Sequence, residues 1–139
     1  MALSGIWGVK RKRYVRVHSL INQAVIADKC LVAECFLDRL KGLIGRSVFE
    51  PGDGMLFPKC NDIHMWFMKI PIDVLFLRPV KTDGESTVWK VSSMHENVRP
   101  WKPIPLVDWR ASETLELPAG SVRTHAISAG DEICINSLS

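Results

Sequence analysis

Short apolar segments separated by turn residues recur along most of the chain. Such runs, broken by Gly, Pro, Asn and Asp, are typical of a mainly β domain. The pattern predicts strands over 14–27 (broken near 22–23), 29–33, 55–57, 63–68, 72–77, 87–92, 113–117 and 132–136. We therefore expect a small antiparallel β-sandwich or barrel-like domain.

Helical periodicity is clear in one segment, residues 34–45. Its apolar residues recur at helical spacing, and Gly45 follows the last of them as a suitable C-terminal cap. The sequence predicts one amphipathic α-helix there. A possible short second helix is expected over about 119–126, after Pro118.

Two ionisable residues interrupt apolar strands between residues 54 and 77, namely His64 and Asp73. A buried ionisable group is costly unless it is paired or hydrogen-bonded. Strand alternation places Asp73 on the same face as Leu75 and Leu77. His64 and Asp73 are therefore either parts of the scaffold or parts of a functional site.

The length of 139 residues fits one domain, and 24% charged residues is close to the globular average. No apolar run approaches the roughly 18–20 residues needed to cross a bilayer. The first nine residues are too short and too weakly apolar for a signal peptide. As written, the chain is expected to be cytoplasmic, unless a leader was trimmed.

The net charge of +3 arises from a basic cluster near the N-terminus. The cluster consists of Lys10, Arg11, Lys12, Arg13 and Arg16. We expect residues 1–16 to form a basic, flexible arm and residues 17–139 to form a single β-rich domain. Such an arm could contact nucleic acid or an anionic membrane surface, but a solvated terminus is the favoured interpretation.

The four cysteines, Cys30, Cys35, Cys60 and Cys134, match no zinc-binding spacing. Reduced, mostly buried thiols are the expected state. Methionines near His64, including Met68, could suggest copper(I), but core packing accounts for them better. The sequence predicts no metal site and no cofactor.

Several segments together resemble the domain-of-unknown-function 192 family, which is widespread in bacteria and archaea. The matching segments are Gly42-Leu43 with Arg46, Gly54-Met55-Leu56-Phe57, His64 with Met68, Pro71-Ile72-Asp73-Val74-Leu75-Phe76-Leu77, Leu115-Glu116-Leu117-Pro118-Ala119-Gly120 and Gly130-Asp131. They keep the order and spacing of the family from about residue 28 to residue 135. The resemblance implies a compact β-rich domain with a helix, and it implies no reaction.

The polar and sulfur-bearing residues of these motifs form the candidate ligand site: Arg46, His64, Met68, Asp73 and Glu116. In a functional reading, Asp73 orients the His64 imidazole and Arg46 holds an anionic group. In a scaffold reading, Arg46 pairs with a carboxylate and Asp73 caps backbone N–H groups. Trp101 and Trp109 lie in a proline-rich connection and are candidates for an exposed contact surface.

The first functional hypothesis is a non-enzymatic module that binds a small molecule or a protein, with a pocket near His64, Asp73 and Arg46. The second is a small hydrolase-type enzyme in which His64 and Asp73 do acid–base work. Catalysis is the less favoured of the two, because no nucleophile elbow or phosphate loop is present. The third is contact of the 10–16 arm with an anion or with nucleic acid.

Overall fold

The computed structural model describes residues 13–33, 49–63, 70–100 and 104–138. Within these ranges the elements are β1 (Arg13–Ser19), β2 (Val25–Val32), β3 (Asp53–Phe57), β4 (Asp62–Ile63), β5 (Ile72–Asp83), β6 (Ser86–Val98), β7 (Leu106–Val107), β8 (Glu113–Pro118), α3 (Ser121–Thr124) and β9 (Glu132–Ser137). The helix predicted over 34–45 and most of the strand predicted over 63–68 lie outside the described residues.

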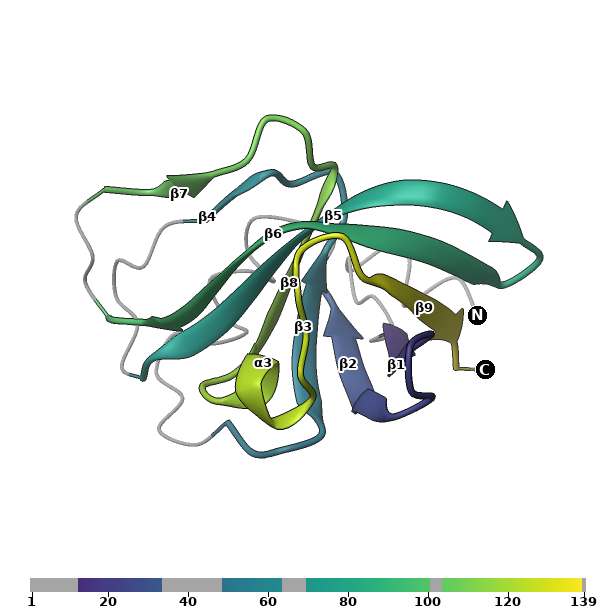
Figure 1. Cartoon of the computed structure of the whole chain (residues 1–139), viewed down its shortest axis with the longest axis horizontal. Helices are drawn as coiled ribbons and strands as arrows, with labels where there is room; N and C mark the ends of the chain where they lie inside the picture. Colours follow the sequence, from purple (N-terminus) through teal and green to yellow (C-terminus); the bar gives the residue numbers. More distant parts are fainter. Residues whose placement is uncertain (1–12, 34–48, 64–69, 101–103, 139) are drawn as a thin grey trace, which may run out of the picture.

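Seven strands close into a barrel in the order β1-β2-β3-β8-β5-β6-β9 (Figure 1). The barrel closes because β9 pairs with both β1 and β6. The β2–β3 pair is parallel, whereas the other barrel pairs are antiparallel. The mainly β, barrel-like prediction is confirmed, as is the short helix near residue 120, since α3 lies within residues 119–126.

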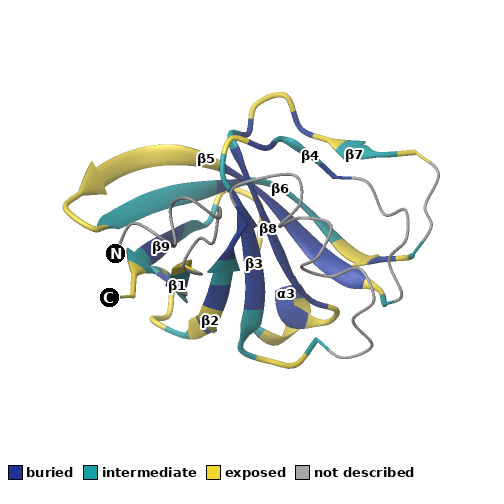
Figure 2. Ribbon diagram, turned by 180° about the vertical axis from the view of Figure 1, so that it is seen from behind, coloured by how far each residue is buried: buried dark blue, intermediate teal, exposed yellow. Residues whose placement is uncertain are grey.

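Strand alternation fills the barrel interior. Leu75 and Leu77 from β5 meet Leu115 and Leu117 from β8 in one buried cluster, all without exposed surface. Figure 2 shows the resulting gradient, with buried strands in the middle of the fold and an exposed tip on the β5–β6 hairpin. The interior of the barrel is therefore a packed core.

A second apolar cluster lies on the outer face of the same strands. Val74 and Phe76 of β5 join Met55 and Phe57 of β3 there, and all are buried. The cluster includes Ile63 of β4, which forms a two-stranded sheet with β7 beside the barrel (Figure 1). This outer cluster explains why β5 is apolar on both faces.

Gly54 belongs to one of the family-like motifs, and its neighbours show why glycine is present. A Cβ atom at this position would lie 3.1 Å from Cys30 Sγ and 3.2 Å from the Cβ of Ala27. Contacts this short require the neighbours to move within a packed core. Gly54 therefore lets β3 approach β2 closely in their parallel pair.

Strand β1 begins at Arg13, earlier than the expected domain boundary. Residues 13–16 belong to the barrel, because Val15 is buried in the interior and pairs with Cys30 and Ser137. Residues 13–16 of the predicted arm therefore belong to β1, and residues 1–12 lie outside the described residues. In the part of the chain that is described, no helix has the length and hydrophobicity to span a bilayer.

Candidate functional site

Asp73 lies inside one end of the barrel with no exposed surface. Its Oδ1 accepts a hydrogen bond from the backbone N–H of Asn97 at 2.8 Å. Its Oδ2 accepts from the N–H groups of Gly120 at 3.1 Å and Val122 at 2.9 Å. One carboxylate thus joins β5, the end of β6 and the first turn of α3. Asp73 therefore caps backbone N–H groups, as the scaffold interpretation of the sequence predicted.

The register places Asp73 and Glu116 on opposite faces of the sheet. Asp73 pairs with Leu117, which belongs to the interior cluster, whereas Glu116 pairs with Val74, which belongs to the outer cluster. Neighbouring residues on a strand point to opposite faces. The structure therefore does not bring these two predicted site residues together, and Asp73 is sealed away from any solvent-open site.

The other predicted site residues divide into two groups. Arg46, His64, Met68, Trp101 and the basic residues Lys10, Arg11 and Lys12 lie outside the described residues. Arg13 and Arg16 are exposed on β1, and Trp109 is 85% exposed after β7. Glu116 is thus the one ligand-site candidate that the structure describes and places on the outer face.

A row of outward side chains crosses the sheet at Glu116. Met55 on β3 and Val74 on β5 pair with Glu116 on either side. His95 on β6 pairs with Val74, so the imidazole continues the row. Glu116 is only 5% exposed, whereas His95 is half-buried, with its ring edge-to-face against Phe76 at a centroid distance of 5.7 Å. An acid and an imidazole therefore flank one apolar residue on a common face.

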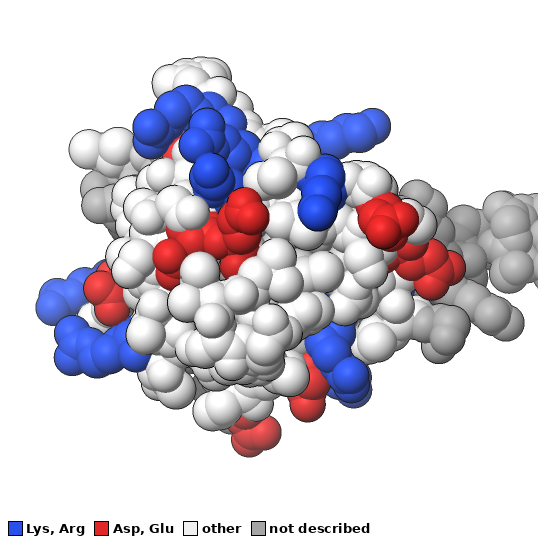
Figure 3. Space-filling model, turned by 45° about the vertical axis from the view of Figure 1, so that its right-hand side comes forward, with Lys and Arg blue, Asp and Glu red and all other residues white. Residues whose placement is uncertain are grey.

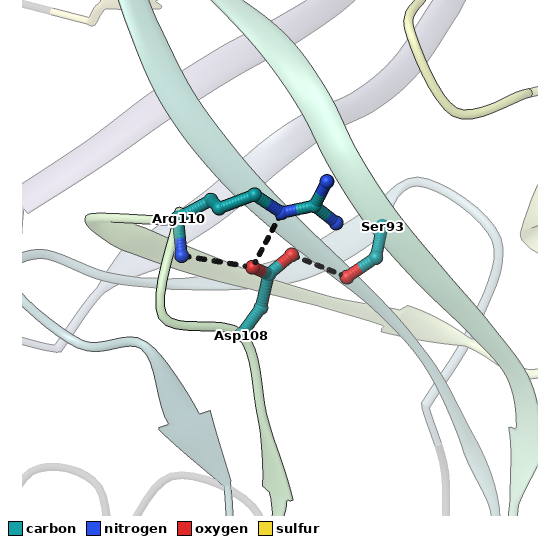
Figure 4. A network of polar contacts seen from close by, with 3 residues as sticks. All are labelled: Ser93, Asp108 and Arg110. Carbon is teal, nitrogen blue, oxygen red and sulfur yellow. Dashed lines mark hydrogen bonds and ion pairs between the residues drawn. The ribbon is translucent and has the colours of Figure 1, made fainter.

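In the next cross-strand row of the outer face, Phe76 of β5 pairs with Ser93 of β6. Ser93 belongs to a polar network with Asp108 and Arg110 (Figure 4). Ser93 Oγ donates to Asp108 Oδ2 at 2.6 Å, and the backbone N–H of Arg110 donates to Oδ1 at 3.0 Å. Burial alone would raise the pKa of Asp108. Hydrogen bonds from Ser93, Ser92 and the Arg110 backbone, with the nearby Arg110 charge, outweigh burial and lower the pKa to about 2. The lowered pKa keeps Asp108 ionised at neutral pH, and its hydrogen bond with Ser93 joins the segment after β7 to β6.

The polar groups Ser93, His95 and Asp108 do not form a hydrolytic triad. In such a triad the carboxylate orients the imidazole, and the imidazole contacts the nucleophile. Here the carboxylate of Asp108 accepts a hydrogen bond directly from the Ser93 hydroxyl. Within the described residues, no group of three or more His, Cys, Asp or Glu side chains is placed to hold a metal.

Sequence reasoning missed His95, Ser93 and Asp108. Residues 93–97 lie beyond the strand predicted over 87–92, and nothing in that segment alone sets His95 apart. The distinguishing signal is the cross-strand register, because Val74 pairs with both Glu116 and His95. A hairpin alignment of β5 with β6 from the Asp83-Gly84 turn would have placed His95 near Val74, subject to the bulges that shift the register.

Glu113 gives a pH-dependent prediction that is independent of any ligand. Burial raises the pKa of its carboxyl, and the Lys59 N–H and charge and the Ser112 hydroxyl offset this only in part. The stability that the protonated acid contributes is complete below the unfolded pKa near 4.3, and it is lost as the pH rises through the folded pKa. Glu113→Gln should therefore raise the free energy of unfolding at pH 7 by the order of 1 kcal/mol.

Urea denaturation of both proteins between pH 3.5 and 7 measures this difference, which should shrink toward zero at the acid end. The control is Glu85→Gln, because Glu85 is exposed. A Glu113→Gln variant that is less stable than the wild type at pH 7 would show that the charged form of Glu113 is favoured in the fold.

Comparison with known proteins places the chain in a family. A family model described as an uncharacterized ACR, DUF192, matches residues 19–135. The chain belongs to the DUF192 family. The match covers the barrel from the end of β1 to β9 and includes Asp73, Glu116 and His95. A search of curated proteins finds no match.

Two solved structures resemble this DUF192 chain. One is a candidate transcription regulator from Sinorhizobium meliloti 1021, with 24% identity and a TM-score of 0.69 over 88% of this chain and 92% of the other. Another is a protein of unknown function from Novosphingobium aromaticivorans DSM 12444, with 22% identity and a TM-score of 0.65 over 86% and 82%. Identities this low support the barrel fold and assign no function.

Proposed function

We propose that this DUF192 chain is a non-enzymatic binding module whose small-molecule site lies on the outer face of the barrel, around Glu116 and His95. The observation that carries the proposal is the placement of an acid and an imidazole on either side of Val74. Adjacent strands lie about 4.8 Å apart, so the two Cα atoms are roughly 10 Å apart. A ligand that spans this distance would contact both side chains.

The surroundings of the two polar residues indicate the chemistry of the ligand. Val74 and Phe76 lie between and beside them without exposed surface, so they form an apolar layer beneath the proposed site, and Phe57 lies in the next row. Such a site suits a compact molecule with an apolar or planar body and polar groups at its ends. Glu116 would accept a hydrogen bond from the ligand, and His95 would donate or accept one.

Arg46, His64 and Met68 remain predicted ligand-site residues from the other family-like motifs, and they lie outside the described residues. Asp73 is excluded from the proposed site, since three backbone N–H groups occupy its carboxylate inside the barrel. The exclusion of Asp73 also weakens the hydrolase alternative, in which Asp73 and His64 together do acid–base work. Binding without chemistry is therefore the function that the described geometry supports best.

A thermal-shift screen against metabolites, sugars and metals tests the proposal. A ligand at 100 times its Kd stabilises the folded state by about 2.7 kcal/mol, which corresponds to a rise in Tm of roughly 5–10 °C. We expect His95→Gln and Glu116→Gln to remove the shift caused by a specific ligand. His125→Gln is the matched control, because His125 lies beside α3 and away from the site.

The comparison with His125→Gln decides the outcome. A ligand that stabilises the wild type and both site variants equally binds elsewhere, and that result would contradict the proposed location. Turnover of the ligand that is lost in a folded His64→Ala variant would favour the enzyme alternative instead.

Contact with nucleic acid remains the weaker alternative. Its support is the exposed Arg13 and Arg16 on β1 and the description of one structural neighbour as a candidate transcription regulator. Figure 3 shows Lys and Arg side chains interspersed with Asp and Glu on the face that it displays. Nucleic-acid surfaces usually present a continuous basic patch, so the mixed charges of this face do not favour the alternative.

A further inference from the structure

A second polar cluster lies on the outer face of β1, β9 and β6, and the proposed ligand site uses neither β1 nor β9. Its members are Cys134 and Asn136 on β9, His18 on β1 and Ser86 on β6. They point outward because their strand neighbours, such as Ile133, Ile135 and Val17, fill the barrel interior. His18 pairs directly with Cys134, so their Cβ atoms are about 4.5–5.5 Å apart.

Asn136 connects the thiol to the imidazole. Its Oδ1 accepts hydrogen bonds from Cys134 Sγ at 3.5 Å and from the hydroxyl of Ser86. Its Nδ2 lies 3.5 Å from Nδ1 of His18. With the amide donating to Nδ1, the proton of the neutral imidazole is on Nε2, and Nδ1 carries the free electron pair. The amide of Asn136 is thus hydrogen-bonded to the Cys134 thiol at one end and to the His18 imidazole at the other.

The amide of Asn136 can also satisfy the ionised pair. If the thiol proton moves to Nδ1 of His18, a half-turn of the amide points Oδ1 at the new Nδ1–H and Nδ2 at the thiolate. The two ends of an amide have nearly the same shape, so this exchange requires no repacking. After the half-turn the Ser86 hydroxyl accepts from Nδ2 instead of donating to Oδ1. The ionised state is the one in which a thiol acts as a nucleophile.

Cys30 provides the contrast within the same fold. It has no exposed surface, lies in the barrel interior and has a pKa that burial raises to about 12. Cys134 lies on the outer face, with 8% of its surface exposed. On the same outer face the exposed Arg16 of β1 pairs with Asn136, whereas Lys90 of β6 pairs with Glu132. An exposed cation one strand away attracts an anionic reagent.

We propose that Cys134 is a site of reversible mixed-disulfide formation with low-molecular-weight disulfides that carry carboxylates, and that His18 is its proton acceptor. The Cys134 proton moves to Nδ1 of His18, and the thiolate attacks one sulfur of the disulfide. A new S–S bond forms on Cys134 as the reagent's S–S bond breaks. The departing thiolate takes the proton back from His18, so one thiol is consumed and one is released.

The test measures the rate of mixed-disulfide formation on each cysteine of the native protein at pH 7.5. Oxidised glutathione is the anionic reagent and bis(2-hydroxyethyl) disulfide the neutral one, and peptide mass spectrometry after acid quenching locates the product. We expect Cys134 to react at least about tenfold faster than Cys30. His18→Gln should slow Cys134 by about tenfold with both reagents.

Two further variants distinguish the effect of proton transfer to His18 from the effect of charge attraction and from a general effect of a His→Gln substitution on the fold. Arg16→Gln should slow the reaction with glutathione by roughly two- to fivefold and leave the neutral reagent unaffected. His125→Gln should leave both rates unchanged. Should His18→Gln fail to fold, Asn136→Leu removes the shared amide and should slow the reaction in the same way.

The comparison within the wild type does not depend on any variant. If Cys134 reacts no faster than Cys30, the site does not exist. If Cys134 reacts fast but at the same rate in folded His18→Gln, His18 is not its proton acceptor and the proposal is overturned in that form. Neither result bears on the ligand site at Glu116 and His95, because the two clusters share no residue.

Discussion

Asp73→Asn is expected to lower the free energy of unfolding by about 3–5 kcal/mol. The carboxylate accepts three backbone hydrogen bonds in a fully buried position. An amide offers one oxygen and turns two N–H donors toward groups that are themselves donors. Because a domain of this kind is stable by about 5–15 kcal/mol, the loss would be a large part of the total.

Urea denaturation measures the loss as a shift of the midpoint at constant slope. Asp83→Asn is the matched control, because it removes the same charge from an exposed Asp-Gly turn in which Asn-Gly is equally favourable. That control should change the stability by less than about 0.5 kcal/mol. An Asp73→Asn variant as stable as the control would mean that Asp73 does not hold the scaffold, and it would return Asp73 to the list of ligand-binding candidates.

The role of Asp73 shows how far the sequence could be interpreted. Alternation placed the residue correctly on the face of Leu75 and Leu77, and the cost of burying a carboxylate identified it as unusual. Its three hydrogen-bond partners lie 24, 47 and 49 positions further along the chain. Local patterns carry no information about such distant donors, so the choice between scaffold and site needed the fold.

The fold likewise has features that local sequence patterns predict and features that depend on contacts between distant residues. Apolar segments and turn residues predicted strands over 72–77 and 113–117 and the Asp83-Gly84 turn, and the structure has strands or a turn at each. Closure of the barrel depends on pairing between β9 and β1, whose residues are more than 100 positions apart. The parallel β2–β3 pair is also non-local, since a crossover joins its strands. Neither contact leaves a local signature.

The candidate site was predicted only in part for a related reason. Glu116 was identified through its motif, but its closest polar neighbour in the outer row, His95, lies on a different hairpin strand. Bulges shift the β5–β6 register at three places, including one between Ile72 and Val74. A single shift moves every later side chain to the other face. Two of these shifts lie between the turn and Val74 and cancel, so the Val74–His95 pair keeps the register of Asp83–Ser86. The sequence shows neither where the bulges fall nor that they cancel, so the pair could not be assigned from the sequence alone.

Phe76→Ala is expected to lower the free energy of unfolding by about 3–5 kcal/mol, although Phe76 lies on the outside of the barrel. Phe76 has no exposed surface and packs in the outer cluster with Val74 and Phe57. Its loss would leave a cavity and remove the edge-to-face contact with His95. Urea denaturation measures the effect, and Phe76→Leu should lie between the wild type and the alanine variant.

The size of this effect distinguishes a second core from a covered but loosely packed surface. Val80→Ala is the control on the same strand, because Val80 is 47% exposed beyond the region that the cluster covers, and it should cost less than about 0.5 kcal/mol. If Phe76→Ala cost only about 1 kcal/mol or less, the outer face would be open to water in solution. The apolar floor proposed beneath the ligand would then lack the fixed shape that a specific site requires, because shape is maintained by close packing. A large loss, in contrast, would show that the floor between Glu116 and His95 is as rigid as the barrel interior.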